Sequence, residues 1–167
     1  SAGGQPSSSG VAIPLYRWRR VLLVPASHPL AALSGPPSLA ELSRHPLISY
    51  ESSKLPESSL QRAFAAVGAE PQIAMTARDA NLIKTYVRAG LGAGLLAEMA
   101  TGTREDEDLR IIEAPAEIPE CITWAVIPRG RVLREYALAL LHALAPQIDR
   151  RDLRRVLEGN QEAKWPP

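Results

Sequence analysis

The chain has 167 residues, of which 46% are hydrophobic and 22% are charged, and this composition excludes a disordered chain and favours one compact core. Nineteen Lys and Arg residues offset eighteen Asp and Glu residues, so the net charge of +1 argues against a domain that grips the phosphate backbone of DNA by itself. A single cysteine, Cys121, excludes an internal disulfide, and no apolar run approaches the ~20 residues that span a bilayer. We therefore expect a cytoplasmic protein that has no membrane partner.

The first half of the chain predicts alternating strands and helices. Residues 1–10 are rich in Ser and Gly, and we assign residues 1–14 to a flexible tail. Short apolar runs then predict strands at residues 20–26, 47–50 and 72–76. Apolar residues at helical spacing predict helices at residues 38–43, which Ser38 would cap, and at residues 57–67, where Gly68 stands as a terminating residue.

The second half continues the same alternation. A helix that either Thr76 or Asp79 caps should run to Arg88 and end at Gly90. Strands follow at residues 94–97, 109–112 and 121–127, and helices at residues 132–144 and 149–158. The first of these two helices carries an apolar stripe, made of Leu133, Tyr136, Ala137, Leu140, Leu141 and Leu144. Strands that alternate with helices of about ten residues predict an α/β fold, a mainly parallel sheet flanked by helices.

Familiar catalytic and metal patterns are absent from the sequence. His28, His45 and His142 stand far apart without ligand spacing, so we expect no metal and no cofactor. Cys121 opens an apolar strand, where burial makes a thiol inert. Glycines 90, 92 and 94 follow a helix and precede a strand, the reverse of the order in dinucleotide-binding turns, so they indicate a helix stop with close packing.

The segment from Ser49 to Ser59 is the best candidate for a binding site. A strand end there delivers the hydroxyl groups of Ser49, Ser52, Ser53 and Ser58 to the start of a helix. Free N–H groups at a helix start favour a small anion or carboxylate, and open α/β sheets bind ligands at the carboxyl ends of their strands. The alternative is that these serines only cap the helix.

Three segments resemble LysR-type transcriptional regulators of the CysB-like branch. They are DANLIKTYVRAGLGAGLLA at residues 79–97, LYRWRR at residues 15–20 and RHPLISY at residues 44–50. The resemblance implies an effector-binding domain shaped like the periplasmic binding proteins, in which two α/β lobes hold a small ligand. It assigns residues 15–103 to the second lobe, residues 104–147 to a return segment toward an incomplete first lobe, and residues 148–167 to a C-terminal helix and tail.

The resemblance also implies a function. CysB-like proteins sense small anionic effectors (acetylated serine, sulfate or thiosulfate), and Trp18 matches a tryptophan that lines their cleft, although a purely structural role for Trp18 is equally compatible with the sequence. Leu55, Pro56 and Glu57 stand where the family usually has Thr-Gly-Arg, which puts direct sulfate contact at that point in doubt. DNA would be a partner only through an N-terminal helix-turn-helix that this sequence lacks, and the full-length protein would be a homo-oligomer, a tetramer.

We thus expect a ligand sensor of sulfur assimilation and cysteine biosynthesis, and not an enzyme. The alternatives are a stand-alone small-molecule binding domain and a small α/β enzyme, and the enzyme would need a nucleophile with a positioned base.

Overall fold

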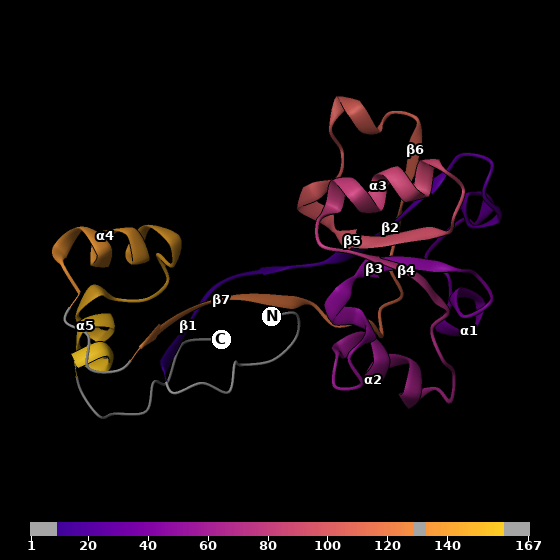
Figure 1. Ribbon diagram of the computed structural model, residues 1–167. Coiled ribbons are helices and arrows are strands. Elements are labelled where there is room, and N and C mark those ends of the chain that lie inside the picture. Colours follow the sequence, from indigo (N-terminus) through magenta and orange to yellow (C-terminus); the bar gives the residue numbers. More distant parts are fainter. Residues whose placement is uncertain (1–9, 129–132, 159–167) are drawn as a thin grey trace. The chain divides into compact units, whose positions relative to one another are not determined.

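The computed structural model describes residues 10–128 and 133–158, which form two compact units (Figure 1). One unit spans Trp18–Cys121, and the other combines the described residues up to Arg17 with those from Ile122 onward. The predicted second lobe, residues 15–103, therefore ends too early, because the strand Leu109–Glu113 still belongs to its sheet. Within the described ranges, no helix combines the length and the apolar character needed to cross a membrane.

A five-stranded sheet forms the centre of the Trp18–Cys121 unit, with the strand order β4-β3-β5-β2-β6. Its strands are β2 (Arg20–Pro25), β3 (Leu47–Tyr50), β4 (Ile73–Ala77), β5 (Ala93–Ala97) and β6 (Leu109–Glu113). Strand β6 pairs with β2 from Val21↔Glu113 to Pro25↔Leu109, which assigns it to this sheet and not to the predicted return segment 104–147.

The α/β arrangement is as predicted, but the sheet is mixed and not mainly parallel: two of its four strand pairings are parallel and two are antiparallel, because one strand is reversed. Strand β3 is parallel to β4 and β5, whereas β2 is antiparallel to both β5 and β6. Strands β3, β4, β5 and β6 thus share one direction. The crossovers β3-α2-β4 and β4-α3-β5 are βαβ units, and such a crossover keeps its two strands parallel. Strand β2 is not joined to its neighbours β5 and β6 by a crossover of this kind, so it can run in the opposite direction.

Helices cover both faces of this sheet (Figure 1). Helices α1 (Leu39–Leu42) and α2 (Ser59–Ala66) pack against the face that carries Leu22 and Leu95. Helix α3 (Ala80–Arg88) covers the opposite face, which carries the adjacent residues Leu23 and Leu96. Successive strand residues point to opposite faces, so a strand buried on both sides is apolar throughout, as the short runs in the sequence indicated.

Capping residues define where the helices begin and end. Ser38 and Ser58 accept hydrogen bonds from the N–H groups of Glu41 and Gln61, and Asp79, not Thr76, caps α3 through Leu82 N–H. Gly68 and Gly90 follow α2 and α3 with φ of 68° and 74°, the left-handed conformation that only glycine adopts without strain. Short 3-10 turns lie at Pro29–Ala32, Glu51–Lys54, Glu98–Ala100 and Arg104–Asp106.

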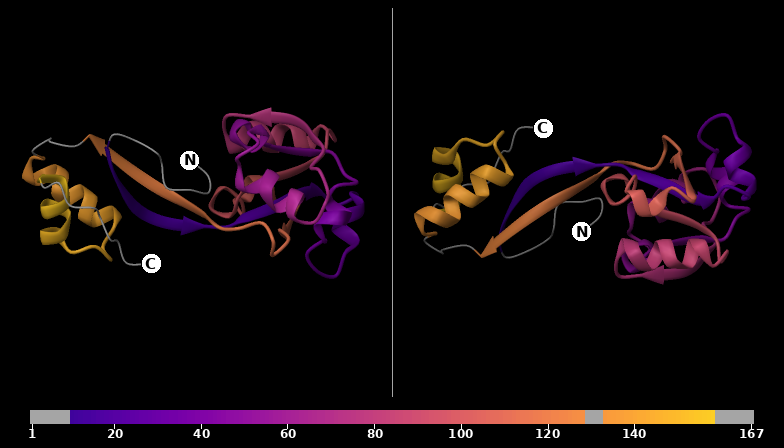
Figure 2. Two further views of the ribbon diagram at one scale, coloured as in Figure 1. Left: turned by 90° about the horizontal axis from the view of Figure 1, so that it is seen from below. Right: turned by 90° about the horizontal axis from the view of Figure 1, so that it is seen from above.

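The second unit contains a two-stranded ribbon of β1 (Gly10–Trp18) and β7 (Cys121–Pro128), whose end residues Trp18 and Cys121 still belong to the first unit. Two helices, α4 (Glu135–Leu144) and α5 (Arg150–Glu158), complete it (Figure 2). The assignment of residues 1–14 to a tail is wrong at its end, because β1 already begins at Gly10 and Val11 and Ile13 are buried. Those apolar residues pack against α4 and α5. Residues 1–9 and 159–167, which we assigned to tails, lie outside the described residues.

Candidate functional site

Helix α2 begins close after the carboxyl end of β3, with only the 3-10 turn Glu51–Lys54 and four further residues between them. This is the place where open α/β sheets expose helix N-termini to ligands. The structure therefore brings Ser49, Ser52, Ser53 and Ser58 into one connection, as the sequence predicted.

Two of the four serines point into the protein. Ser49 is fully buried, where its hydroxyl group donates to the Leu95 carbonyl at 3.0 Å and shares a 2.9 Å hydrogen bond with Ser53 Oγ. Ser53 is also buried, and its carbonyl accepts from Ser58 Oγ at 3.2 Å and from Gln61 Nε2 at 3.1 Å. Their side chains thus hold the turn before α2 in a fixed shape.

The other predicted residues are more accessible. Ser58 is half-buried and caps α2 through Gln61 N–H at 3.2 Å, so the capping alternative holds for its hydroxyl group. Ser52 is exposed, and Trp18 is half-buried at the end of β1. Leu55, where the resembling family usually has threonine, is 49% exposed and brings no hydroxyl group to the helix start.

Arg20 is the functional candidate that the sequence analysis missed. It is only 7% exposed, and its Nη2 donates to Ser59 Oγ, in the first turn of α2, and to Cys121 Sγ at 2.9 Å. Its Nη1 is buried and has no hydrogen-bond partner among the described residues. The available signal was a charged residue at the head of the apolar run RVLLVP, which we interpreted only as the start of a strand.

Tyr50, the last residue of β3, is another polar residue in the segment that leads to α2. Its hydroxyl oxygen accepts a hydrogen bond from Ala97 N–H at 3.4 Å. Burial raises the pKa of Tyr50 above its ordinary value, the hydrogen bond from Ala97 opposes the rise, and Asp79 and Cys121 add to it. The side chain therefore remains a neutral phenol near pH 7 and can donate its proton to an anion.

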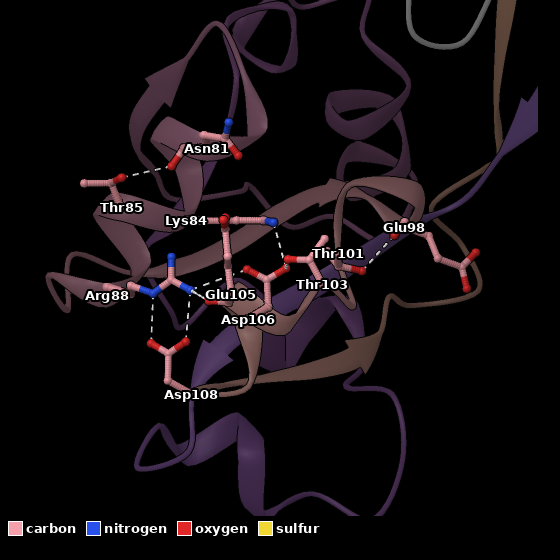
Figure 3. Close-up of polar contacts among 10 residues, drawn as sticks. All are labelled: Asn81, Lys84, Thr85, Arg88, Glu98, Thr101, Thr103, Glu105, Asp106 and Asp108. Carbon is pink, nitrogen blue, oxygen red and sulfur yellow. Dashed lines mark hydrogen bonds and ion pairs between the residues drawn. The ribbon is translucent and has the colours of Figure 1, made fainter.

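A second polar cluster joins α3 to the turn Arg104–Asp106 (Figure 3). The Nζ of Lys84 lies 2.7 Å from Asp106 Oδ2, and Thr103 Oγ1 donates to the same oxygen at 3.0 Å. Arg88 forms a fork with both carboxylate oxygens of Asp108, at 2.8 and 2.9 Å. Asp106 and Asp108 each have a basic partner, so these contacts fix the turn beside α3.

The pKa of Asp106 reflects these contacts. Burial alone would raise it, but the hydrogen bonds from Lys84 and Thr103, together with the charge of Lys84, hold the pKa below its ordinary value. The carboxylate is therefore ionised at neutral pH. No three His, Cys, Asp or Glu residues within residues 10–128 and 133–158 are arranged to hold a metal ion.

Comparison with known proteins matches residues 2–149 to the family described as LysR substrate binding domain. The regulator CysB of Burkholderia cenocepacia is 34% identical over 153 residues, and the regulator Cbl of Escherichia coli is 35% identical over 153 residues. These matches cover 92% and 91% of this chain but 49% and 48% of the relatives, so the chain spans about half the length of the curated relatives that it matches.

A solved structure agrees with these matches. The crystal structure of the cofactor-binding domain of the Cbl transcriptional regulator superposes with a TM-score of 0.81 at 34% identity, and covers 89% of this chain and 65% of that chain. The α/β class and the resemblance to the CysB-like branch are therefore confirmed. The chain belongs to the family of LysR-type substrate-binding domains of transcriptional regulators.

Proposed function

We propose that this chain is the effector-sensing part of a cytoplasmic LysR-type regulator of sulfur assimilation and cysteine biosynthesis. Its ligand is a small anionic metabolite of the acetylated serine, sulfate or thiosulfate type. The relatives that support the sulfur role are named CysB, Cbl and SsuR, each described as an HTH-type transcriptional regulator.

The observation that carries the proposal is the position of the α2 N-terminus, directly after the carboxyl end of β3. Ser58 satisfies Gln61 N–H, and the earlier N–H groups of the first turn have no carbonyl within the helix to bond. These donors and the positive end of the helix dipole favour an anion. Around this point we assign ligand contacts to Trp18 and Ser52, and a supporting role to Ser49, Ser53 and the capping residue Ser58.

Leu55, Pro56 and Glu57 stand where the family usually has Thr-Gly-Arg, and this difference affects which effector can bind. A threonine hydroxyl group is absent there and an exposed acid, Glu57, is added. One charge-assisted contact is worth roughly 1.5 to 3 kcal/mol, or one to two decades of affinity. We propose that an organic anion, which gains apolar contacts beside Leu55, binds better here than bare sulfate.

The mechanism is a population shift and not chemistry. In the full-length protein, the effector favours one arrangement of the effector-binding lobes and so biases an oligomer on DNA. DNA contact belongs to a helix-turn-helix outside this chain, and we propose a homo-tetramer as the full-length assembly. The chain is non-catalytic in this proposal.

Isothermal titration calorimetry with N-acetylserine, thiosulfate and sulfate tests the binding role. We expect saturable heat with at least one of the three and weaker binding by sulfate than by N-acetylserine. Flat titrations with all three would refute the proposal. An assay for consumption of O-acetylserine separates a sensor from an enzyme, because a sensor leaves the ester intact.

A further inference from the structure

Arg20 carries a buried positive charge for which the described residues supply no carboxylate partner. The side chain is 7% exposed, and no carboxylate in residues 10–128 and 133–158 forms an ion pair with it. Its two closest partners, Ser59 Oγ and Cys121 Sγ, both contact Nη2. The two N–H groups on Nη1 remain without an acceptor among the described residues.

The neighbouring residue shows the ordinary alternative. Arg19 is exposed, and its Nε and Nη2 form a fork with both carboxylate oxygens of Glu98, at 3.2 and 3.0 Å. Arg20, in contrast, is buried and forms no ion pair within residues 10–128 and 133–158. Removing a charged group from water costs several kcal/mol unless it is paired, so an unpaired buried guanidinium is hard to explain as a device for stability.

A cavity beside Arg20 offers room for the missing partner. It has a volume of about 290 Å³, near the lower end of the ~300 to 1,000 Å³ typical of small-molecule sites, and Arg20, Val21 and Ile118 help to line it. Glu98, Glu113 and Glu120 also line it, but all three are exposed and Glu98 pairs with Arg19, so their charges are screened far more than that of Arg20. The least screened charge at this cavity is therefore positive.

We propose that Arg20 anchors the anionic group of the effector, a carboxylate or a small oxyanion, through Nη1. Ser59, which Nη2 of Arg20 contacts, connects this anchor to the first turn of α2. The guanidinium offers two parallel N–H groups, a geometry that matches a carboxylate or sulfate oxygen pair. The inference rests on the proposed function and names a residue that would supply positive charge next to the first turn of α2.

The anchor lies wholly within the Trp18–Cys121 unit. Arg20, Ser59 and Cys121 come from β2, α2 and β7 and meet inside that unit. The anionic end of a ligand can therefore bind to this chain by itself. A full-length regulator adds contacts to the rest of the ligand, which raises affinity without changing the anchor.

The test measures the thermal unfolding midpoint of the whole chain at increasing sulfate or N-acetylserine, with chloride at matched ionic strength as baseline. Sulfate also stabilises proteins without binding a site, and the Arg20→Gln and Arg20→Met variants measure that general effect. Two variants are used because the test requires a folded Arg20 variant. Circular dichroism shows which of them fold. Arg19→Gln is the matched control, since it removes an exposed arginine next to the same cavity.

We expect a saturable rise of the midpoint in the wild-type protein and in Arg19→Gln for at least one of the two anions. In both Arg20 variants, the apparent Kd should weaken at least tenfold. A response to N-acetylserine but not to sulfate would identify a carboxylate as the bound group, and the reverse would identify an inorganic oxyanion.

Two contrary results have different meanings. If the wild-type protein responds and the folded Arg20 variants respond equally, the anchor is overturned and the proposed sensing function stands. If the wild-type protein responds to neither of these anions, nor to thiosulfate, beyond the chloride baseline, both the anchor and the proposed function are overturned.

Discussion

Ser58 connects the turn before α2 to the first turn of the helix. Its Oγ donates to the Ser53 carbonyl and accepts from Gln61 N–H, both at 3.2 Å. A cap of this kind satisfies one of the N–H groups that a helix start leaves without a partner. The Ser58 hydroxyl group therefore helps, together with Ser49 and Ser53, to shape the turn before α2.

Replacing that hydroxyl group should cost stability. We expect Ser58→Ala to lower the free energy of unfolding by about 1 kcal/mol, the usual loss of an N-cap, as measured by urea denaturation. Ser52→Ala is the matched control, because Ser52 is exposed in the same loop and its replacement should change stability by less than ~0.5 kcal/mol. Equal effects of the two substitutions would contradict the capping role.

Residue-scale features were only partly accessible from the sequence. The serines were found because a polar helix start after a short strand is a local pattern. Arg20 was not, because Arg19 and Arg20 are adjacent and chemically identical, and only the pairing of β2 with β5 and β6 decides which of them is buried. Burial of a charge is a property of the tertiary structure.

At the scale of elements, the Lys84–Asp106 contact ties the turn Arg104–Asp106 to α3 (Figure 3). The pKa of Asp106 is lowered in the folded protein, so its stabilising effect is complete above the ordinary carboxyl pKa of about 4. The effect is lost as the pH falls through the lower folded value. Acid should therefore loosen this contact.

This contact predicts a pH dependence. Between pH 6 and pH 3, the urea midpoint of the wild-type protein should fall more steeply than that of Asp106→Asn, which cannot lose a charge at position 106. The variant should also be less stable at pH 6, because Lys84 is buried without its counter-ion. Parallel pH profiles for the two proteins would show that Asp106 does not carry the effect.

The turn between α3 and β5 depends on Gly92. Its φ is 154°, and a Cβ at this position would lie 2.5 Å from the Pro46 carbonyl oxygen, which itself accepts Ala93 N–H at 2.8 Å. We expect Gly92→Ala to cost about 1 to 3 kcal/mol in urea denaturation. Gly35→Ala, with nothing within 4 Å of the added Cβ, should be neutral or slightly stabilising, and equal losses would contradict the argument.

The elements themselves were largely predictable, since their signals are local. The strand at residues 47–50, the Asp79 alternative for the α3 cap and the structural interpretation of glycines 90, 92 and 94 all agree with the structure. The start of β1 was missed, because the apolar residues Val11 to Ile13 directly follow a Ser- and Gly-rich stretch. The reversal of β2 is set by long-range pairing, which local patterns do not contain.

The described residues taken together leave an apolar surface exposed on α4. The predicted stripe on α4 is only partly buried: Tyr136, Leu140 and Leu144 are 70%, 60% and 44% exposed, while Leu141 packs inside. These three residues recur every four positions and so share one side of the helix. An exposed apolar patch of this kind promotes association between molecules.

We therefore expect the chain to self-associate through α4. In sedimentation velocity, the wild-type protein should sediment faster as its concentration rises, and Leu140→Lys should shift toward the monomer with little loss of stability. Ser34→Lys adds the same charge at an exposed site in the other unit and should behave like the wild type. If Leu140→Lys associates as strongly as Ser34→Lys, α4 is not the contact surface.

Mapping amide chemical shifts during titration with N-acetylserine tests whether a small anion binds at the start of α2. We predict saturable shifts that are largest at Ser59 and Leu60 in the first turn of the helix, with smaller shifts at Arg20 and Cys121. Amide chemical shifts that do not change, or saturable changes confined to α4 and α5, would contradict anion binding at the start of α2.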